Sequence, residues 1–160
     1  MDHDEDPVAR VQDALTTEDG RSGKLGEWIS RVLPYLKVTH ADQTAPARVD
    51  FSFTCHNDHC NRMGSLHGGA AASIFDVCTS LPLLLVSKPG YWQFLGVSRN
   101  LSVSYFRPVP PGEEVIIETE IVQIGKNLCT TKGVMKRKRD GATMSTCEHL
   151  KVNIDPQPSL

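Results

Sequence analysis

The 160-residue sequence lacks a paired set of cysteines, a long hydrophobic run and a recognisable targeting segment. Its five cysteines are an odd number in a chain with no sign of secretion, which favours free thiols over a disulfide framework. No apolar run reaches the roughly 18 residues of a membrane span, and the longest, Leu81 to Val86, contains a proline. The acidic start has neither the apolar core of a secretory signal nor the arginines of a mitochondrial transit peptide. We expect a cytoplasmic protein without a membrane span, with a mitochondrial or peroxisomal location left open.

An excess of basic charge is also missing. The net charge is −2, and four of the 19 acidic residues lie within the first six positions. The remainder is nearly neutral, which excludes the basic footprint of a nucleic-acid-binding protein, so we expect no nucleic-acid partner. The length and a hydrophobic content of 39% suit one domain with a sizeable core.

The N-terminal third divides into two segments before that domain. Residues 1–21 are polar, with a weak helical spacing at Val8, Val11 and Leu15, and we expect a flexible segment or a loosely held helix. Residues 22–46 are expected to form an N-terminal helix and a linker. Ser22 is the candidate N-cap, Pro34 ends the run, and the apolar residues at helical spacing are Leu25, Trp28, Ile29, Val32 and Leu33.

The pattern at residues 47–155 predicts an α+β domain with antiparallel strands. A strand is expected at 47–55 from the alternation of its apolar residues, and a helix at 68–86 that Pro82 kinks. Four further strands follow as a meander, separated by turns at 108–112 and 125–127 and by the hairpin signal Asp140-Gly141. The pattern alone supports a helix that covers one face of a sheet.

The start of the predicted central helix is the most informative segment. His67 precedes Gly68 and Gly69, whose backbone N–H groups lie at the positive end of the helix dipole and can stabilise an oxyanion. Asp76 stands among apolar residues, where a carboxylate is costly unless it is paired or used as a general base. Because Gly68 and Asp76 lie roughly 12 Å apart along the axis, one chain cannot bring them together. A second copy with an antiparallel helix can.

The motif Asn61-x5-His67-Gly68-Gly69, with Asp76 nine residues after the histidine, resembles the hotdog-fold acyl-CoA thioesterases. The similarity is to the phenylacetyl-CoA group and its animal and fungal relatives, the thioesterase superfamily members. It extends from about Asp50 to about Lys151 and includes Ser98. The resemblance implies a hotdog fold, a curved antiparallel sheet wrapped around the helix, and an acyl-CoA thioester hydrolase with no metal or redox cofactor.

The resemblance also implies roles for the matching residues. Asp76 activates water that Ser98 holds against it, while Gly68 and Asn61 polarise the thioester carbonyl. His67 orients the substrate or the loop. Asp76 and Ser98 come from one subunit and the other residues from its partner, which implies a homodimer and a pairing of dimers into a homotetramer. Taken singly, these residues also have ordinary structural readings: an exposed helical aspartate, a glycine turn, an Asx-turn and a polar strand serine.

We expect basic side chains to bind the phosphates of CoA. The densest basic run is Lys136 to Arg139, of which at most half can face one ligand because side chains alternate along a strand. A charged, solvated hairpin edge explains this run equally well. Our candidates for binding the substrate are Gly69, Lys126, Arg137, Arg139 and His149, with Arg107 as a weaker one.

Three other interpretations stay open. Cys55, His56, His59 and Cys60 offer four zinc ligands in six residues, but zinc sites usually use two separated pairs, so we favour a polar loop and expect no metal. A hotdog dehydratase or hydratase should pair its histidine and acid at a different spacing. A non-catalytic acyl-CoA-binding hotdog protein could keep every residue named above, so only an assay separates it from an enzyme.

Overall fold

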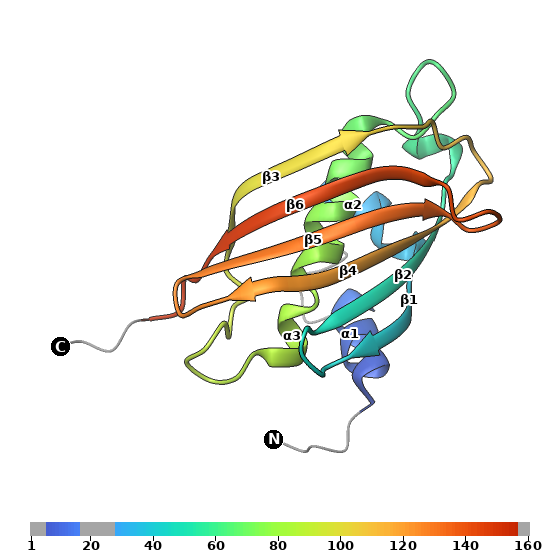
Figure 1. The fold of residues 1–160 in the computed structure, drawn as a ribbon. Coiled ribbons are helices and arrows are strands. Elements are labelled where there is room, and N and C mark those ends of the chain that lie inside the picture. Colours follow the sequence, from blue (N-terminus) through green and yellow to red (C-terminus); the bar gives the residue numbers. More distant parts are fainter. Residues whose placement is uncertain (1–5, 17–27, 157–160) are drawn as a thin grey trace.

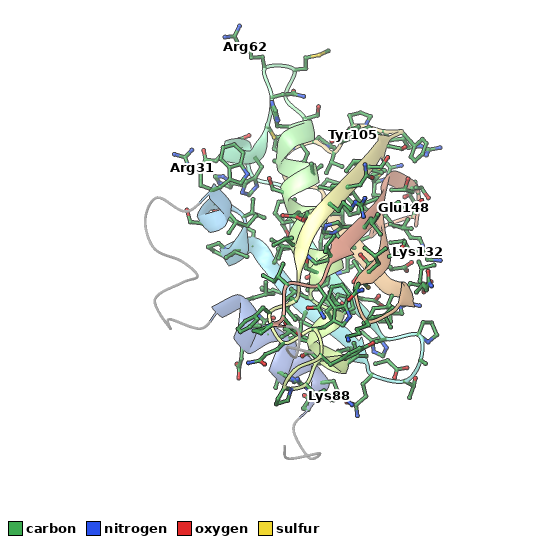
Figure 2. The ribbon with its side chains drawn as sticks, turned by 90° about the vertical axis from the view of Figure 1, so that its left-hand side faces the viewer. Arg31, Arg62, Lys88, Tyr105, Lys132 and Glu148 are labelled. Atoms are coloured by element: carbon green, nitrogen blue, oxygen red, sulfur yellow. The ribbon has the colours of Figure 1, made fainter. Side chains whose placement is uncertain are left out.

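The computed structural model describes residues 6–16 and 28–156. One sheet of six antiparallel strands, in the order β1-β2-β4-β5-β6-β3, curves around a long helix, α2 (Figures 1 and 2). The helix spans Gly68–Ser80. The strands are β1 Leu36–Asp42, β2 Arg48–Thr54, β3 Val97–Tyr105, β4 Glu114–Ile124, β5 Leu128–Arg137 and β6 Thr143–Val152. This is the α+β hotdog architecture that we expected.

The core lies between α2 and the concave face of the sheet. Alternation along each strand directs every second side chain toward the helix, and the helix presents its apolar side to the same layer. The strand predicted at 47–55 is confirmed, with three alternating residues completely buried in β2. Residues with no exposed surface in this layer include Val49, Phe51, Phe53, Ile74, Phe75, Cys78, Val115, Ile117 and Met135.

Gly133 sets how closely α2 approaches β5. A Cβ atom at this position would lie 2.9 Å from Cδ1 of Phe75, closer than real side chains pack, and 3.0 Å from Cγ2 of Thr79, a tight contact. The missing side chain therefore lets the helix rest directly on the strand, which fixes the height of the helical residues above the sheet.

The pairing of the later strands differs from the predicted meander. The turns at 108–112, 125–127 and 140–141 are confirmed, but β3 pairs with β6 at the edge of the sheet, and β4 pairs with β2. Local turn signals fix only consecutive strands, whereas this pairing depends on the chain wrapping around α2. β1 lies in the segment 22–46 that we expected to be a helix and a linker, so this strand was missed. A bulge between Val38 and His40 interrupts its alternation, which hid the strand from the sequence pattern.

The described part of the N-terminal region has one α-helix, at the weaker of the two predicted helical patterns. Helix α1 spans Pro7–Thr16, within the segment expected to be flexible or loosely helical, and its Val11 is completely buried. The helix predicted near Trp28 is instead two short 3₁₀ turns, Trp28–Arg31 and Leu33–Tyr35. Pro34 lacks an N–H and disfavours α-helix in the residue before it, which explains the shorter turns. Ser22 and Leu25 lie outside the described residues.

Pro82 divides the predicted central helix. α2 ends at Ser80, and a short helix, α3, spans Leu83–Val86. By length and composition alone, the stretch Gly68–Val86 could cross a membrane, with a mean hydropathy of 1.7. In this structure half of it is buried inside the protein, where it forms the core helix.

Candidate active site

The candidate residues form two clusters along α2. We call Asn61, His67 and Gly68, around the start of the helix, the glycine cluster, and Asp76 with Ser98, two turns further on, the aspartate cluster. Asn61 and Gly68 line one pocket, Asp76 and Ser98 line another, and the two pockets share no residue. The single chain therefore keeps the two clusters apart, as the helical spacing predicts.

His67 organises the first turn of α2. It is the N-cap residue, and its Nδ1 accepts a hydrogen bond of 2.9 Å from the backbone N–H of Gly69. The Gly69 N–H, which we predicted to bind substrate, is thereby occupied. Among the described residues, no acceptor receives a hydrogen bond from the Gly68 N–H. That N–H is the free donor at the positive end of the helix dipole.

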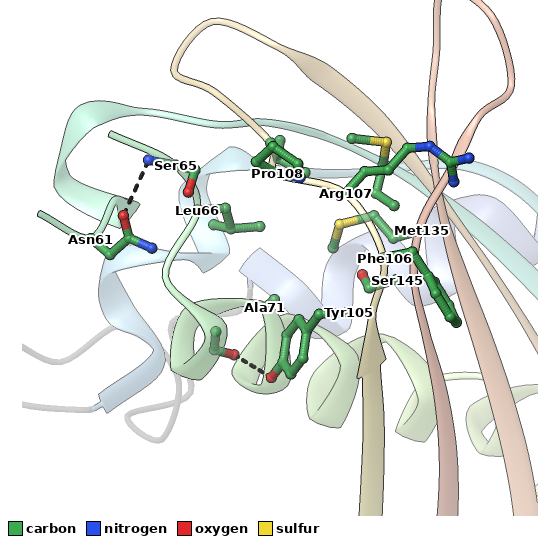
Figure 3. Close-up of a pocket in the computed structure, with 13 residues that line it drawn as sticks. Asn61, Ser65, Leu66, Ala71, Tyr105, Phe106, Arg107, Pro108, Met135 and Ser145 are labelled. Atoms are coloured by element: carbon green, nitrogen blue, oxygen red, sulfur yellow. Dashed lines mark hydrogen bonds between the residues drawn. The ribbon is translucent and has the colours of Figure 1, made fainter. Parts of the chain in front are cut away.

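Asn61 fixes the loop before the helix and also presents a hydrogen-bond donor to the pocket. Its Oδ1 accepts hydrogen bonds from the backbone N–H groups of Met63 (2.9 Å) and Ser65 (3.3 Å), which fix the loop before the helix. Figure 3 shows its amide nitrogen turned toward the pocket that Gly68 also lines. Asn61 is thus an Asx-type loop residue that still presents a donor to a ligand.

Tyr105 completes the wall of this first pocket, which has a volume of about 350 Å³. Its hydroxyl donates a 2.8 Å hydrogen bond to the carbonyl oxygen of Gly68 (Figure 3). Burial raises the pKa of Tyr105, so the phenol remains a donor at neutral pH. Apart from these groups and Arg107, the lining is mostly apolar and includes Leu66, Ala71, Phe106, Pro108, Val109, Met135 and Met144.

Asp76 is held by a strand at the edge of the sheet. The Ser98 hydroxyl of β3 donates a 2.8 Å hydrogen bond to Oδ1 of Asp76. His149 of β6 lies behind them, with Nε2 2.8 Å from Ser98 Oγ and 3.5 Å from Asp76 Oδ1. The Asp76 side chain is 49% exposed, more than we expected for a helix wrapped by a sheet, because it faces the open edge beside β3. The carboxylate is therefore accessible to a ligand.

His149 is buried and electrically neutral. Burial, followed by the positive charge of Lys151, lowers the pKa of His149 to about 4, against the opposite influence of Asp76. Its Nδ1 lies 2.7 Å from Oγ1 of Thr79, whose hydroxyl donates to the Phe75 carbonyl at 2.6 Å. Both ring nitrogens thus contact groups of the protein.

The pocket beside the aspartate cluster is larger and mostly apolar. It has a volume of about 520 Å³, and its walls include Trp28 and Ile29 from the N-terminal region. The Trp28 indole N–H donates a 2.7 Å hydrogen bond to Ser73 Oγ, although 83% of the residue is exposed. Ala72, Val77 and Leu101 complete the apolar wall. An apolar group of a ligand fits this surface, with a carboxylate and a hydroxyl at its edge.

Of the basic residues predicted to bind phosphate, Arg107 lines the first pocket, whereas Lys126, Arg137 and Arg139 line neither pocket. Arg137 pairs with Asp140 at 2.8 Å, and Arg139 lies 3.6 Å from Glu113. Lys126 is exposed in the turn between β4 and β5. Their role in binding substrate stays a prediction. His149 is buried beneath the aspartate cluster, so it is placed to act on Asp76 and Ser98 and not on a phosphate.

The cysteine and histidine loop is organised by hydrogen bonds. His59 Nδ1 accepts from the backbone N–H of His56, and its Nε2 lies 2.8 Å from the Arg31 carbonyl. The Cys55 and Cys60 sulfurs are 3.6 Å apart, and burial raises the pKa of Cys55 to about 12. Within residues 6–16 and 28–156, no three histidine, cysteine or acidic side chains converge as metal ligands.

Sequence reasoning missed the roles of Thr79, Tyr105 and Trp28. Thr79 lies three residues after Asp76, on the same side of the helix, which was an available signal. A second signal was the set of alternate β6 residues that face the core. Several of them are polar or ionisable, whereas residues at such positions are usually apolar. That set contains Ser145, Cys147, His149 and Lys151.

Comparison with known proteins identifies the family of this chain. The family model described as Thioesterase superfamily matches residues 63–144, about half of the chain. The human protein named Acyl-coenzyme A thioesterase 13 is 28% identical over 121 residues, which cover 76% of this chain and 81% of that protein.

Two solved structures share the fold. The structure of thioesterase superfamily member 2 from Mus musculus has a TM-score of 0.76 at 22% identity, and the match covers 92% of this chain and 98% of that chain. A hypothetical thioesterase from Streptococcus pneumoniae, solved with coenzyme A, has a TM-score of 0.65 at 16% identity, over 76% of this chain and 88% of that chain.

Proposed function

This chain belongs to the thioesterase superfamily, and on that premise we propose that it hydrolyses an acyl-CoA thioester to a free acid and CoA. The observation that carries the proposal is the pairing of Asp76 with Ser98 at the edge of a mostly apolar pocket. A half-exposed carboxylate that is fixed by a hydroxyl can hold and deprotonate a water molecule next to a bound acyl group. The relatives named above support the same reaction.

We infer that the complete site forms between two copies of the chain. Gly68 and Asp76 are separated by roughly 12 Å along α2, whereas a general base must lie within about 3 Å of the water that it activates. A two-fold axis between antiparallel α2 helices would place the glycine cluster of one copy against the aspartate cluster of the other, twice in each dimer. The exposed edge strand β3 leaves the aspartate cluster open to such a partner.

The reaction then uses each cluster for one task. The Gly68 N–H and the Asn61 amide of one copy bind the thioester oxygen as it becomes an oxyanion, with the helix dipole adding to the stabilisation. Asp76 of the other copy accepts a proton from water while the water oxygen bonds to the thioester carbon. When the tetrahedral intermediate collapses, the carbon–sulfur bond breaks and the thiolate of CoA takes up a proton. His67 maintains the turn that keeps the Gly68 N–H free.

We also propose where the two parts of the substrate lie. The apolar wall that includes Trp28, Val77 and Leu101 suits the acyl group, since it lies beside Asp76. Lys126, Arg137 and Arg139 remain our candidates for the CoA phosphates. Arg137 and Arg139 would have to exchange their carboxylate partners for phosphate.

The test is an assay of free-thiol release with short-chain, long-chain and aromatic acyl-CoA esters, with mass spectrometry to identify the acid. Hydrolysis of at least one class, lost in Asp76→Asn, would support the proposal. Saturable binding of acyl-CoA without thiol release would show a non-catalytic binding protein. Formation or loss of a double bond in the acyl chain, with the thioester intact, would show a hydratase or dehydratase.

A further inference from the structure

A chain of hydrogen bonds runs from the helix backbone to Asp76, buried at Thr79 and His149, exposed at Ser98 and half-exposed at Asp76. It begins at the Phe75 carbonyl and passes through Thr79, His149 and Ser98 to the carboxylate. Its four contacts measure 2.6, 2.7, 2.8 and 2.8 Å, all within hydrogen-bonding range. Thr79 and His149 have no exposed surface, so water cannot substitute for a missing hydrogen at these two residues.

Counting hydrogens shows that this chain is incomplete in its resting state. Each hydroxyl of Thr79 and Ser98 contributes one hydrogen, and a neutral imidazole contributes one more. An ionised Asp76 contributes none, which leaves three hydrogens for four contacts. Whichever way the hydroxyls rotate, one of the four contacts therefore has no hydrogen between its two atoms.

Thr79 decides where the gap lies, because its single hydrogen can go either to the Phe75 carbonyl or to His149 Nδ1. When that hydrogen goes to the Phe75 carbonyl, Nδ1 carries the imidazole hydrogen and Nε2 has only a lone pair to offer Ser98. The contact without a hydrogen is then one of the two that Ser98 makes, with His149 or with Asp76. When the Thr79 hydrogen goes to Nδ1, the imidazole hydrogen is on Nε2 and the contact without a hydrogen is the one at the Phe75 carbonyl.

We propose that Thr79 and His149 are positioning residues for Asp76, because the proton that Asp76 takes from water completes this chain. The role rests on the proposed thioesterase function. Once Oδ1 is protonated, the carboxyl donates to Ser98 and Ser98 turns to donate to Nε2. With Thr79 donating to the Phe75 carbonyl and Nδ1 to Thr79, all four contacts then hold one hydrogen each. The chain thus favours the protonated carboxyl that forms when water attacks.

The step balances without another reactant. One O–H bond of water breaks, its electron pair forms the bond to the thioester carbon, and the proton goes to Asp76 Oδ1. On collapse the carbon–sulfur electron pair goes to sulfur, the carboxyl proton leaves for the thiolate, and Ser98 turns back. No net proton is gained by the protein over one turnover.

Burial, followed by the positive charge of Lys151 on β6, keeps His149 neutral against the opposite influence of Asp76 on α2. The nearby titratable groups also include two thiols, Cys129 on β5 and Cys147 on β6. Burial raises the pKa of Cys129 to about 11 and that of Cys147 to about 12, so neither supplies a negative charge that would stabilise an imidazolium. Burial lowers the pKa of Lys151, whose ammonium donates to Ser80.

Substitution of Thr79 tests the proposal kinetically. Thr79→Val keeps the shape but removes the hydroxyl that orders the chain, and we expect kcat to fall about fivefold or more, the cost of one lost hydrogen bond. KM should change by less than about twofold, since no contact with substrate is lost. The acid-side fall of kcat should move to lower pH, because the carboxyl form loses its support. Thr79→Ser should restore most of the activity.

Thr119→Val is the matched control. Thr119 is also buried and donates a 2.7 Å hydrogen bond to a backbone carbonyl, that of Val49, but it lies outside both clusters. It should lose comparable stability and keep the wild-type kcat and pH profile. Equal kinetic losses in both variants, or an unchanged kcat and pH profile in a folded Thr79→Val protein, would overturn the positioning role.

Nitrogen-15 NMR of the unliganded protein supplies an independent readout. A neutral His149 ring at pH 7 agrees with three hydrogens in the chain, whereas an imidazolium would already supply the fourth and would overturn the proposal. If the unaltered protein releases no thiol from any acyl-CoA, the proposed function fails and this role fails with it. A working hydrolase with unaffected Thr79→Val kinetics would overturn the role alone.

Discussion

The glycine cluster and the aspartate cluster lie on the same helix but are built in different ways. The first is local: a cap, a loop and a backbone N–H within eight residues of sequence, from Asn61 to Gly68. In the second, Asp76 of α2 and Ser98 of β3 contact each other, and both rest on the buried His149 of β6. A local cluster can form wherever its loop forms, whereas the second requires the whole sheet to close around the helix.

The largest effect on activity is expected from a substitution of Asp76 in the aspartate cluster. Asp76→Asn removes the base while the amide keeps its size, so turnover should fall at least about a hundredfold, the lower end for general-base catalysis. The melting temperature and the affinity for CoA should change little, because the carboxylate is half-exposed. Thiol-release kinetics and calorimetry measure the two effects. Near-normal turnover in the folded variant would remove Asp76 from the mechanism.

His149, buried behind the aspartate cluster, predicts that the stability of the fold depends on pH. No residue of the glycine cluster predicts such a dependence. The pKa of His149 is about 4 in the folded protein, and its ordinary value is about 6.5. Between these values the unfolded chain binds the proton that the folded chain refuses, so stability falls as pH falls. From pH 7 to pH 5 this amounts to about 2 kcal/mol, or about 30-fold in the unfolding equilibrium.

Urea titrations at both pH values check this dependence. In His149→Gln the loss between pH 7 and pH 5 should be smaller than in the unaltered protein by about that 2 kcal/mol. His40→Gln, at an exposed position on β1, is the control and should keep the full dependence. An identical pH dependence in all three proteins would show that His149 is not the group responsible.

Mixing two damaged proteins tests whether the clusters come from different copies. Asp76→Asn subunits lack one cluster, and Asn61→Ala subunits lack the amide of the other. In a mixed dimer one site carries both lesions and the other carries neither, so random exchange at equal ratio should give about one quarter of the wild-type activity. Sedimentation must show that exchange occurred. An active monomer, or no recovery after exchange, would rule out the shared site.

The same contrast explains how much the sequence could predict. The glycine cluster follows from residues close in sequence, so the cap, the free Gly68 N–H and the Asn61 loop were within reach of local reasoning. Asp76 stood out among apolar neighbours, but its link to Thr79 and His149 depends on β6 lying beside β3, which no local pattern indicates. The edge position of β3 and the exposed strand β1 were missed for the same reason.

The smallest effect is expected at Trp28, which lines the pocket beside Asp76 but donates its indole N–H to Ser73 and not to the carboxylate. Its indole lines that pocket and donates a hydrogen bond to Ser73. Because 83% of the residue is exposed, the ring can be removed with little loss of core packing. Trp28→Ala should raise KM about threefold or more for long acyl chains, through lost apolar contact, and leave short-chain esters and kcat nearly unchanged. Trp28→Phe keeps an aromatic surface but loses the hydrogen bond to Ser73. Its KM for long acyl chains should lie between the values of the unaltered protein and of Trp28→Ala. An equal change for short and long chains would mean that Trp28 supports the fold of the N-terminal region and does not line the acyl path.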